Sequence, residues 1–232
     1  MFSGGYGVYI LITVVFAGIG GLVSNRLKSK FRKYARVPMT GNMTGAQVAQ
    51  KMLDDHQIRD VRIVMGQGFL SDHYNPRTKT VSLSPEVYQG RSISSAAVAA
   101  HECGHVVQHA ESYTWLTLRS KMVPVVQLAS RAQGLLFLLA FGGFAGGIGG
   151  GGIIFQIAIV AFALTTLFSL ITLPVEFDAS NRALAWLENR NVTVGAQHEG
   201  AKDALWWAAM TYVVSALSAV TVLLWLILQS RR

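Results

Sequence analysis

Residues 153–173 read IIFQIAIVAFALTTLFSLITL and form the later part of a long uncharged run, Ala132–Val175. One helix of that length would be about 66 Å long at 1.5 Å per residue, about twice the hydrocarbon thickness of a bilayer. Eight glycines between Gly142 and Gly152 interrupt the run, and glycine disfavours a helix interior. The run therefore predicts an antiparallel hairpin of membrane-spanning helices over residues 133–149 and 153–173.

Two further segments have the length and polarity of membrane spans. Residues 5–25 and residues 204–230 contain no Asp, Glu, Lys or Arg, and a bilayer crossing needs about 20 predominantly apolar residues. The first segment lacks a charged region before it, which favours a retained anchor over a cleaved signal peptide. The sequence thus predicts an α-helical membrane protein with about four transmembrane helices.

The composition agrees with this class of protein. Hydrophobic residues make up 51% of the chain and charged residues 14%, against roughly 25% charged residues in soluble domains. The net charge of +8 could indicate a nucleic-acid partner, but six of the 20 basic residues lie between Arg26 and Arg36, directly after the first span. A cluster in that position marks the cytoplasmic side of a membrane. We therefore expect a multi-pass protein of the cell membrane that binds no nucleic acid.

Between the first span and the hairpin, residues 26–131 have the pattern of a small α+β domain. The predicted elements are a helix over 44–53 that Thr44 caps, strands over 61–65 and 78–84, a turn at 72–77, and a helix over 96–109 that Ser92 or Ser94 caps. Residues 174–203 are polar again, and a new helix is expected after Pro174. We therefore expect residues 26–131 and 174–203 to form the cytoplasmic part of the chain together.

The chemistry is concentrated in the last helix of the α+β segment, which contains His101-Glu102-Cys103-Gly104-His105. Residues four apart lie on one face of an α-helix, so His101 and His105 can bind one metal ion. Glu102 points beside that ion, where its carboxylate can reach a metal-bound water. This H-E-x-x-H arrangement is typical of zinc-dependent peptidases. We expect His101 and His105 to be zinc ligands and Glu102 to be the general base.

A catalytic zinc needs a third protein ligand, with the fourth position left for water. Glu176 is the leading candidate, because it follows directly after the hairpin returns to the side on which the zinc helix lies. Glu111, Asp178 and His109 are the alternatives. His109 continues the four-residue step, but the three stacked imidazoles would extend over about 12 Å of straight helix. His109 is therefore expected to be a hydrogen-bonding residue near the site.

The remaining chemically active side chains have simpler interpretations. Cys103 is the single cysteine, which excludes an internal disulfide, and it lies on a different helix face from the two histidines. We expect it to pack as a small buried residue. His56, His73 and His198 are expected to be ordinary polar residues. Gly104 costs roughly 1 kcal/mol of helix propensity relative to alanine, which indicates close approach by a substrate or another element.

A peptide substrate can be bound by strand addition to the edge of a sheet. Residues 81–84 belong to the strand candidate that comes directly before the zinc helix, so we expect them to present the substrate. An internal strand without substrate contact is the alternative.

Three segments together resemble one family. His101–His105, Asp72–Pro76 and Pro174–Ser180 are similar to the corresponding parts of the bacterial membrane neutral zinc metallopeptidases of the YugP type, and the resemblance covers nearly the whole chain. It implies a zincin-like catalytic domain of the HExxH, gluzincin-like kind, Zn²⁺ as cofactor, and a peptide or membrane-protein substrate.

The chain is also distantly similar to the HtpX-type and CAAX-prenyl membrane endopeptidases. In those enzymes an Asp four residues after the glutamate ligand supports a zinc-bound histidine. Glu176 matches the ligand, but position 180 is Ser. Asp178 and Asn181 are therefore the candidates for the supporting role.

The sequence as a whole predicts a membrane-anchored zinc endopeptidase. Its expected parts are an anchor over 5–25, a catalytic zinc domain over 26–131, a transmembrane hairpin over 133–173, a third-ligand segment over 174–203 and a last span over 204–230. The alternative is a non-catalytic membrane scaffold or regulatory protein that retains a zinc site. Glu102 argues against it, because a structural zinc site needs no base between its ligands. A transporter would place charged residues inside its spans, and the predicted spans contain none.

Overall fold

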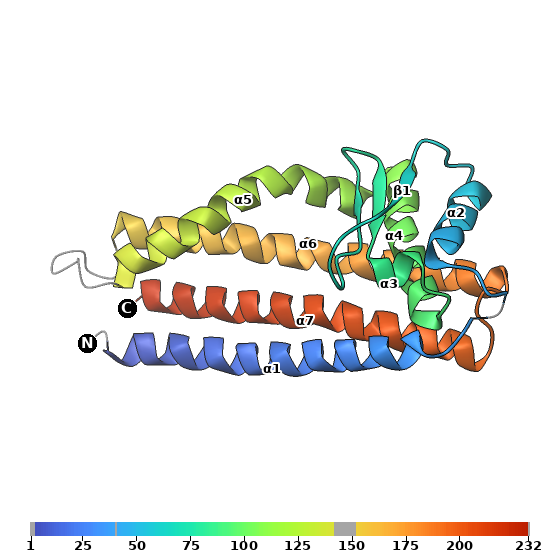
Figure 1. Cartoon of the computed structure of the whole chain (residues 1–232). Helices are drawn as coiled ribbons and strands as arrows, with labels where there is room; N and C mark the ends of the chain where they lie inside the picture. The colour runs from blue at the N-terminus through green and yellow to red at the C-terminus, as the bar shows by residue number, and fades with distance from the viewer. Residues whose placement is uncertain (1–2, 40, 142–151, 232) are drawn as a thin grey trace. The chain divides into compact units, whose positions relative to one another are not determined.

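The computed structural model describes residues 3–39, 41–141 and 152–231, and most of them are helical. The elements are α1 (Ser3–Ala35), α2 (Gly45–Asp55), β1 (Arg62–Met65), β2 (His73–Asn75), β3 (Thr80–Leu83), α3 (Pro85–Tyr88), α4 (Ile93–Ala110), α5 (Thr114–Phe141), α6 (Ile153–Asn189) and α7 (Ala196–Ser230) (Figure 1). They divide into two compact units. Unit 1 contains Met1–Leu22, Leu118–Leu173 and Thr211–Arg232, and unit 2 contains Val23–Thr117 and Pro174–Met210.

Three of the described helices are long and apolar enough to cross a membrane, namely α1 from Gly7 onward, α6 and α7. They include the predicted spans over 5–25, 153–173 and 204–230. The fourth predicted span, 133–149, lies partly in residues 142–151, outside the described residues, and its described part is the end of α5. A helical membrane protein is thus confirmed, and the count of four spans stays a prediction.

Unit 1 contains polar side chains that connect its helices. A cavity of about 530 Å³ is lined by residues of four helices, among them Thr13 of α1, Gln133 of α5, Thr165 of α6 and Ser215 of α7. The Gln133 side chain donates to the Ala161 carbonyl at 3.1 Å and to the Thr165 hydroxyl at 2.8 Å. Polar side chains in membrane bundles satisfy each other across helices in this way, so these bonds join α5 to α6 inside unit 1.

Unit 2 has a hydrophobic core around α4. Its buried residues include Val48, Met52 and Leu53 of α2, Val81 and Leu83 of β3, Ala96, Ala100 and Val106 of α4, Phe31 and Tyr34 of α1, Ala183 and Leu187 of α6, and Ala204 and Leu205 of α7. The ends of the three long apolar helices therefore belong to this core. Apolar burial of this kind is the main stabilising contribution to a folded unit.

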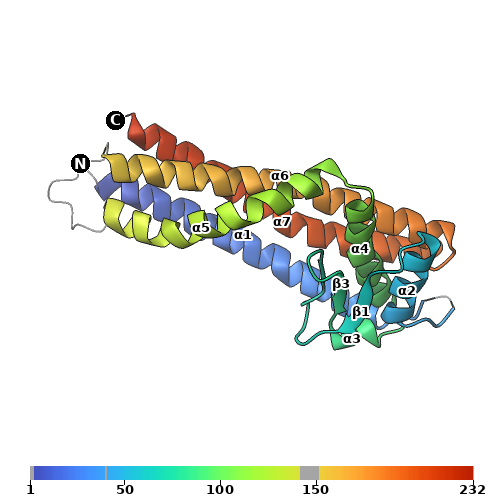
Figure 2. The same ribbon diagram turned by 90° about the horizontal axis from the view of Figure 1, so that it is seen from above.

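The sheet of unit 2 has the order β1-β3-β2. β1 runs parallel to β3, β2 runs antiparallel to it, and Figure 2 shows β1 and β3 side by side. β3 is therefore the central strand, with both edges paired. The expectation that residues 81–84 form an edge strand for the substrate is wrong, because the predicted turn at 72–77 supplies the third strand. The turn itself is shorter, and the Asn75 side chain begins it by accepting the backbone N–H of Arg77 at 3.0 Å.

The helix ends follow their local sequence in two places. The Thr44 hydroxyl accepts the Gln47 N–H at 3.2 Å, and the Gln47 side chain accepts the Thr44 N–H at 2.8 Å, which is a capping box. Ser92 caps α4, because its hydroxyl accepts the Ser95 N–H at 3.3 Å. Both predicted caps are confirmed, with Ser92 rather than Ser94 for α4, which begins at Ile93 and so three residues before the predicted start at Ala96.

The predicted new helix after Pro174 is wrong, because α6 passes through Pro174 without a break. Proline has no backbone N–H to donate and interrupts many helices. Here the residues on both sides remain helical, and Val175 and Ala179 are fully buried. Glu176 therefore lies on the same helix as the apolar residues 153–173.

Candidate metal centre

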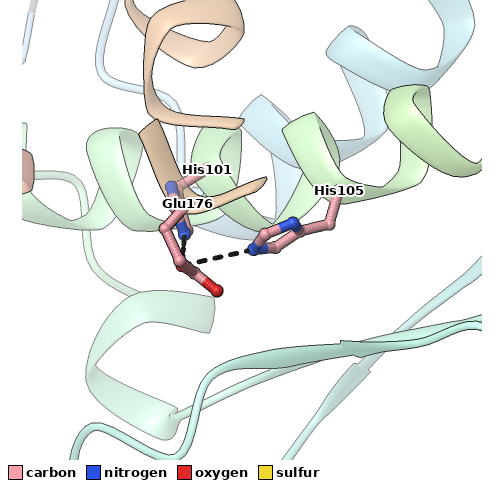
Figure 3. Close-up of side chains that lie close together, drawn as sticks. All are labelled: His101, His105 and Glu176. Atoms are coloured by element: carbon pink, nitrogen blue, oxygen red, sulfur yellow. Dashed lines mark ion pairs between the residues drawn. The ribbon is translucent and has the colours of Figure 1, made fainter. Parts of the chain in front are cut away.

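His101 and His105 project from α4 one turn apart, with ring centroids separated by 4.8 Å. Glu176 reaches them from α6 (Figure 3). Its Oε2 atom lies 3.4 Å from His101 Nε2 and 3.7 Å from His105 Nε2. One ligand atom of each residue lies within 4.8 Å of the other two. The structure thus brings two imidazole nitrogens and one carboxylate oxygen to a common point.

The three side chains fit a zinc ion in type and in spacing. Zinc binds histidine nitrogen and carboxylate oxygen at about 2.0–2.2 Å with tetrahedral geometry, so two such ligand atoms should lie about 3.4 Å apart. The separations from Glu176 Oε2 to the two histidine nitrogens are close to this value. Glu176 and His105 are also buried, and a buried carboxylate requires compensating positive charge.

Glu102 lies next to this group on α4 and is buried as well. Burial raises the pKa of its carboxyl, and the positive charge of His101 and His105 partly offsets that rise. A raised pKa makes the carboxylate a stronger base, which suits a group that has to accept a proton.

Ser180 supports the first histidine. Its hydroxyl lies 3.1 Å from His101 Nδ1, four residues after Glu176 on the same face of α6. Asn181, one of the two candidates for a supporting role, is exposed, and no hydrogen bond of its side chain is found among the described residues. The serine that departs from the HtpX-type pattern therefore occupies the supporting position itself.

Gln108 supports the second histidine and is fully buried. Its Nε2 donates to the Val175 carbonyl and to Asp178 Oδ2, both at 2.8 Å. Because both of these partners are acceptors, the Gln108 oxygen must face His105 Nδ1, 3.0 Å away. A neutral His105 with its proton on Nδ1 would have its Nε2 lone pair on the side of Glu176, where it could bind a metal ion.

Asp178, the other supporting candidate, acts on His105 only through Gln108. Its carboxylate also accepts from Arg182 Nε at 2.6 Å, and the Arg182 guanidinium pairs with Glu111 at 2.6 Å. The result is a chain of hydrogen bonds from His105 to the surface. Sequence reasoning missed Gln108, although its place three residues after His105, next to Val106 and Val107, puts a lone polar side chain on the ligand face.

The chain matches, over residues 9–231, the family described as "Putative neutral zinc metallopeptidase". It belongs to this family. A relative from Bacillus subtilis (strain 168), "Putative membrane protease YugP", is 39% identical over 218 residues, which cover 94% of each protein. No solved structure matches the chain. The family confirms the resemblance seen in the sequence, and with the three converging side chains it establishes zinc as the cofactor.

The other candidate ligands lie outside the three-residue group. His109 Nδ1 is 2.8 Å from the Tyr74 hydroxyl, and Glu111 is exposed and paired with Arg182. Cys103 is buried, with its thiol 3.6 Å from the Ala49 carbonyl. His73 Nδ1 lies 2.8 Å from the Ser71 carbonyl, and His198 lies 3.8 Å from Glu188. His56 follows the last residue of α2.

Proposed function

We propose that the protein is a membrane-anchored zinc endopeptidase in which His101, His105 and Glu176 hold the metal and Glu102 is the general base. The observation that carries the proposal is the approach of Glu176 Oε2 to both imidazole nitrogens, 3.4 and 3.7 Å, directly beside the buried Glu102. A structural zinc site in a scaffold protein would use the same ligands without a buried base next to them.

Each residue has a defined part in peptide hydrolysis. A zinc ion held by His101, His105 and Glu176 would supply the Lewis acid that activates a water and polarises the scissile carbonyl. Glu102 takes the proton of the attacking water and delivers it to the leaving amine. Ser180 and Gln108 hold the two imidazoles so that their Nε2 atoms face Glu176. Burial of Glu102 and Glu176 limits bulk water in the site, which strengthens the electrostatic interactions there.

The substrate we propose is an extended peptide segment. The central strand β3 has no free edge, which leaves β1 and β2 as the two edges of the sheet. β2 is the edge joined to the zinc helix, through the Tyr74–His109 hydrogen bond. Strand addition to β2 would place a peptide backbone along the side of α4.

The active site is proposed to face the cytoplasm in a protein with four spans. The six cations between Arg26 and Arg36 follow the apolar part of α1, and such clusters stay on the cytoplasmic side. Four spans would then place both termini outside. A phosphatase fused after Arg232, active only when exported, should be active, and an inactive fusion would contradict this topology.

The proposed activity is tested by Glu102→Gln, which keeps the size of the side chain and removes the base. Membranes containing the wild type, Glu102→Gln or the exposed control Glu199→Gln are compared for bound zinc and for peptides released from membrane proteins. We expect full zinc in all three and cleavage products in the wild type and the control only. Products that also appear with Glu102→Gln would overturn the assigned base, and their absence from all three would favour the scaffold.

A further inference from the structure

The cytoplasmic half of α1 has two faces with different surroundings. On one face, Phe31 and Tyr34 are buried in the core of unit 2. Lys30 lies on the same side, and its ammonium pairs with Asp203 Oδ2 at 2.7 Å. The Tyr34 hydroxyl donates to the same carboxylate oxygen at 2.6 Å. The side chains on this face therefore pack and form hydrogen bonds within unit 2.

The opposite face, which we call the basic face, consists of Asn25, Lys28, Ser29, Arg32, Lys33 and Arg36. These residues line a groove of about 730 Å³. Their spacing of three, one, three, one and three residues places them along a single side of the helix. All six are exposed. Across residues 3–39, 41–141 and 152–231, no carboxylate forms an ion pair with any of the four cations.

Lys30 has a carboxylate partner among the described residues and the four cations of the basic face have none, which indicates that these cations bind an anion from outside the chain. Lys30 has its carboxylate within unit 2, whereas four like charges on one helix face repel each other unless anions lie between them. The continuous apolar stretch of α1 ends at Val23, directly before this face. The nearest anions for such a segment are the phosphates of lipids in the adjacent leaflet.

We propose that the basic face binds the headgroups of anionic phospholipids. Arg32 and Arg36 can each hold a phosphate through two parallel hydrogen bonds, and Lys28 and Lys33 add positive charge on both sides of them. Asn25 and Ser29 provide neutral hydrogen-bond donors at the end of the groove nearest the apolar residues. The surface is separate from the metal centre, so the proposal does not depend on peptidase activity.

The test uses the full-length protein in non-ionic detergent micelles, titrated with phosphatidylglycerol or with phosphatidylcholine of the same acyl chains. A ligand that binds the folded state raises the thermal unfolding midpoint, and this rise gives its apparent affinity. The variant Lys28→Gln/Arg32→Gln/Lys33→Gln/Arg36→Gln removes the four charges. The control variant Lys51→Gln/Arg59→Gln/Arg62→Gln/Arg77→Gln removes four exposed charges elsewhere in unit 2.

We expect phosphatidylglycerol to raise the midpoint of the wild type and the control, and the basic-face variant to bind it roughly tenfold more weakly or worse. The pair Arg32→Gln/Arg36→Gln should be intermediate, which separates lipid binding from a folding defect. Equal binding by wild type and basic-face variant, or an equal response to phosphatidylcholine, would overturn the proposal. A similar rise with inorganic phosphate alone would also overturn it, since a free-anion site would then explain the groove.

Discussion

Gly104 on α4 lies directly against the backbone of Ala179 on α6: a Cβ atom at Gly104 would be 2.5 Å from the Ala179 carbonyl oxygen. No side chain fits at that distance without movement of one helix. The contact joins the helix that carries His101 and His105 to the helix that carries Glu176. The close approach expected for Gly104 is thus made by α6, the element that supplies the carboxylate of the site.

Gly104→Ala should destabilise unit 2 and weaken zinc binding. Alanine favours a helix by roughly 1 kcal/mol, but separating two packed backbones should cost about 1–3 kcal/mol and move Glu176 away from the histidines. The thermal unfolding midpoint and the zinc content of the purified variant report the two effects. Gly134→Ala is the control, because nothing lies within 4 Å of its added Cβ. A Gly104→Ala protein as stable and as zinc-loaded as this control would contradict the packing argument.

Glu176→Gln should lower zinc affinity, because a neutral amide oxygen is a much weaker zinc ligand than a carboxylate. Glu111→Gln serves as the matched control, since Glu111 is exposed and pairs with Arg182. Competition with a chelator of known affinity measures both variants. If Glu111→Gln loses zinc and Glu176→Gln keeps it, the third ligand is not Glu176.

Gln108→Leu should reduce zinc affinity by about 10- to 100-fold, the range found when a residue that orients a metal-binding histidine is replaced. Leucine of similar volume removes the acceptor for His105 and leaves Asp178 without its buried donor. Ser180→Ala should have a smaller effect in the same direction, since a single hydroxyl contact to His101 is lost. Asn181→Ala, at an exposed position, should bind zinc like the wild type. Equal affinities for all four proteins would show that these contacts do not orient the ligands.

Cys103 should resist thiol reagents in the folded protein. Burial, and secondarily the charge of Glu102, raise the pKa of its thiol, so the reactive thiolate is scarce at pH 8. Maleimide labelling is expected only after unfolding in detergent and denaturant. An exposed thiol introduced as Thr78→Cys should react rapidly under native conditions. Rapid native labelling of the wild type would mean that α4 opens away from α2.

Glu102→Gln should raise the stability of the zinc-free protein at neutral and alkaline pH. The pKa of Glu102 is raised by burial, so the folded state binds its proton more tightly than the unfolded state does. Stability from the protonated form is present at low pH and falls as pH rises through the pKa range of the folded carboxyl. The variant has no such loss, and the gap between the two unfolding midpoints should widen with pH. A gap that is constant with pH would contradict a raised pKa.

The features that depend on local sequence could be predicted. The three apolar helices follow from uncharged runs, and the shared face of His101 and His105 follows from helical spacing alone. Thr44 and Ser92 begin their helices through bonds to residues three positions later. Each of these depends on neighbours within a few turns, so one sequence contains the information needed.

The features that depend on distant residues could not be predicted. The central place of β3 depends on β2, whose residues have the composition of a turn. Pro174 ends a helix by local rules, but α6 continues through it, and Val175 and Ala179 on its far side are fully buried. The Gln108 contacts with His105 and Asp178 connect two helices about 70 positions apart, and no local pattern indicates which polar residue makes them.

The burial of Phe31 and Tyr34 restricts how unit 2 could be separated from the membrane-spanning helices. Both residues belong to α1 and yet form part of the core that surrounds α4. A truncation that removes residues 1–34 would take away one of the three apolar helices and open that core at the same time. A fragment with an intact core would therefore have to keep the last three turns of α1, beginning near Val23, together with residues 174–210 of α6 and α7.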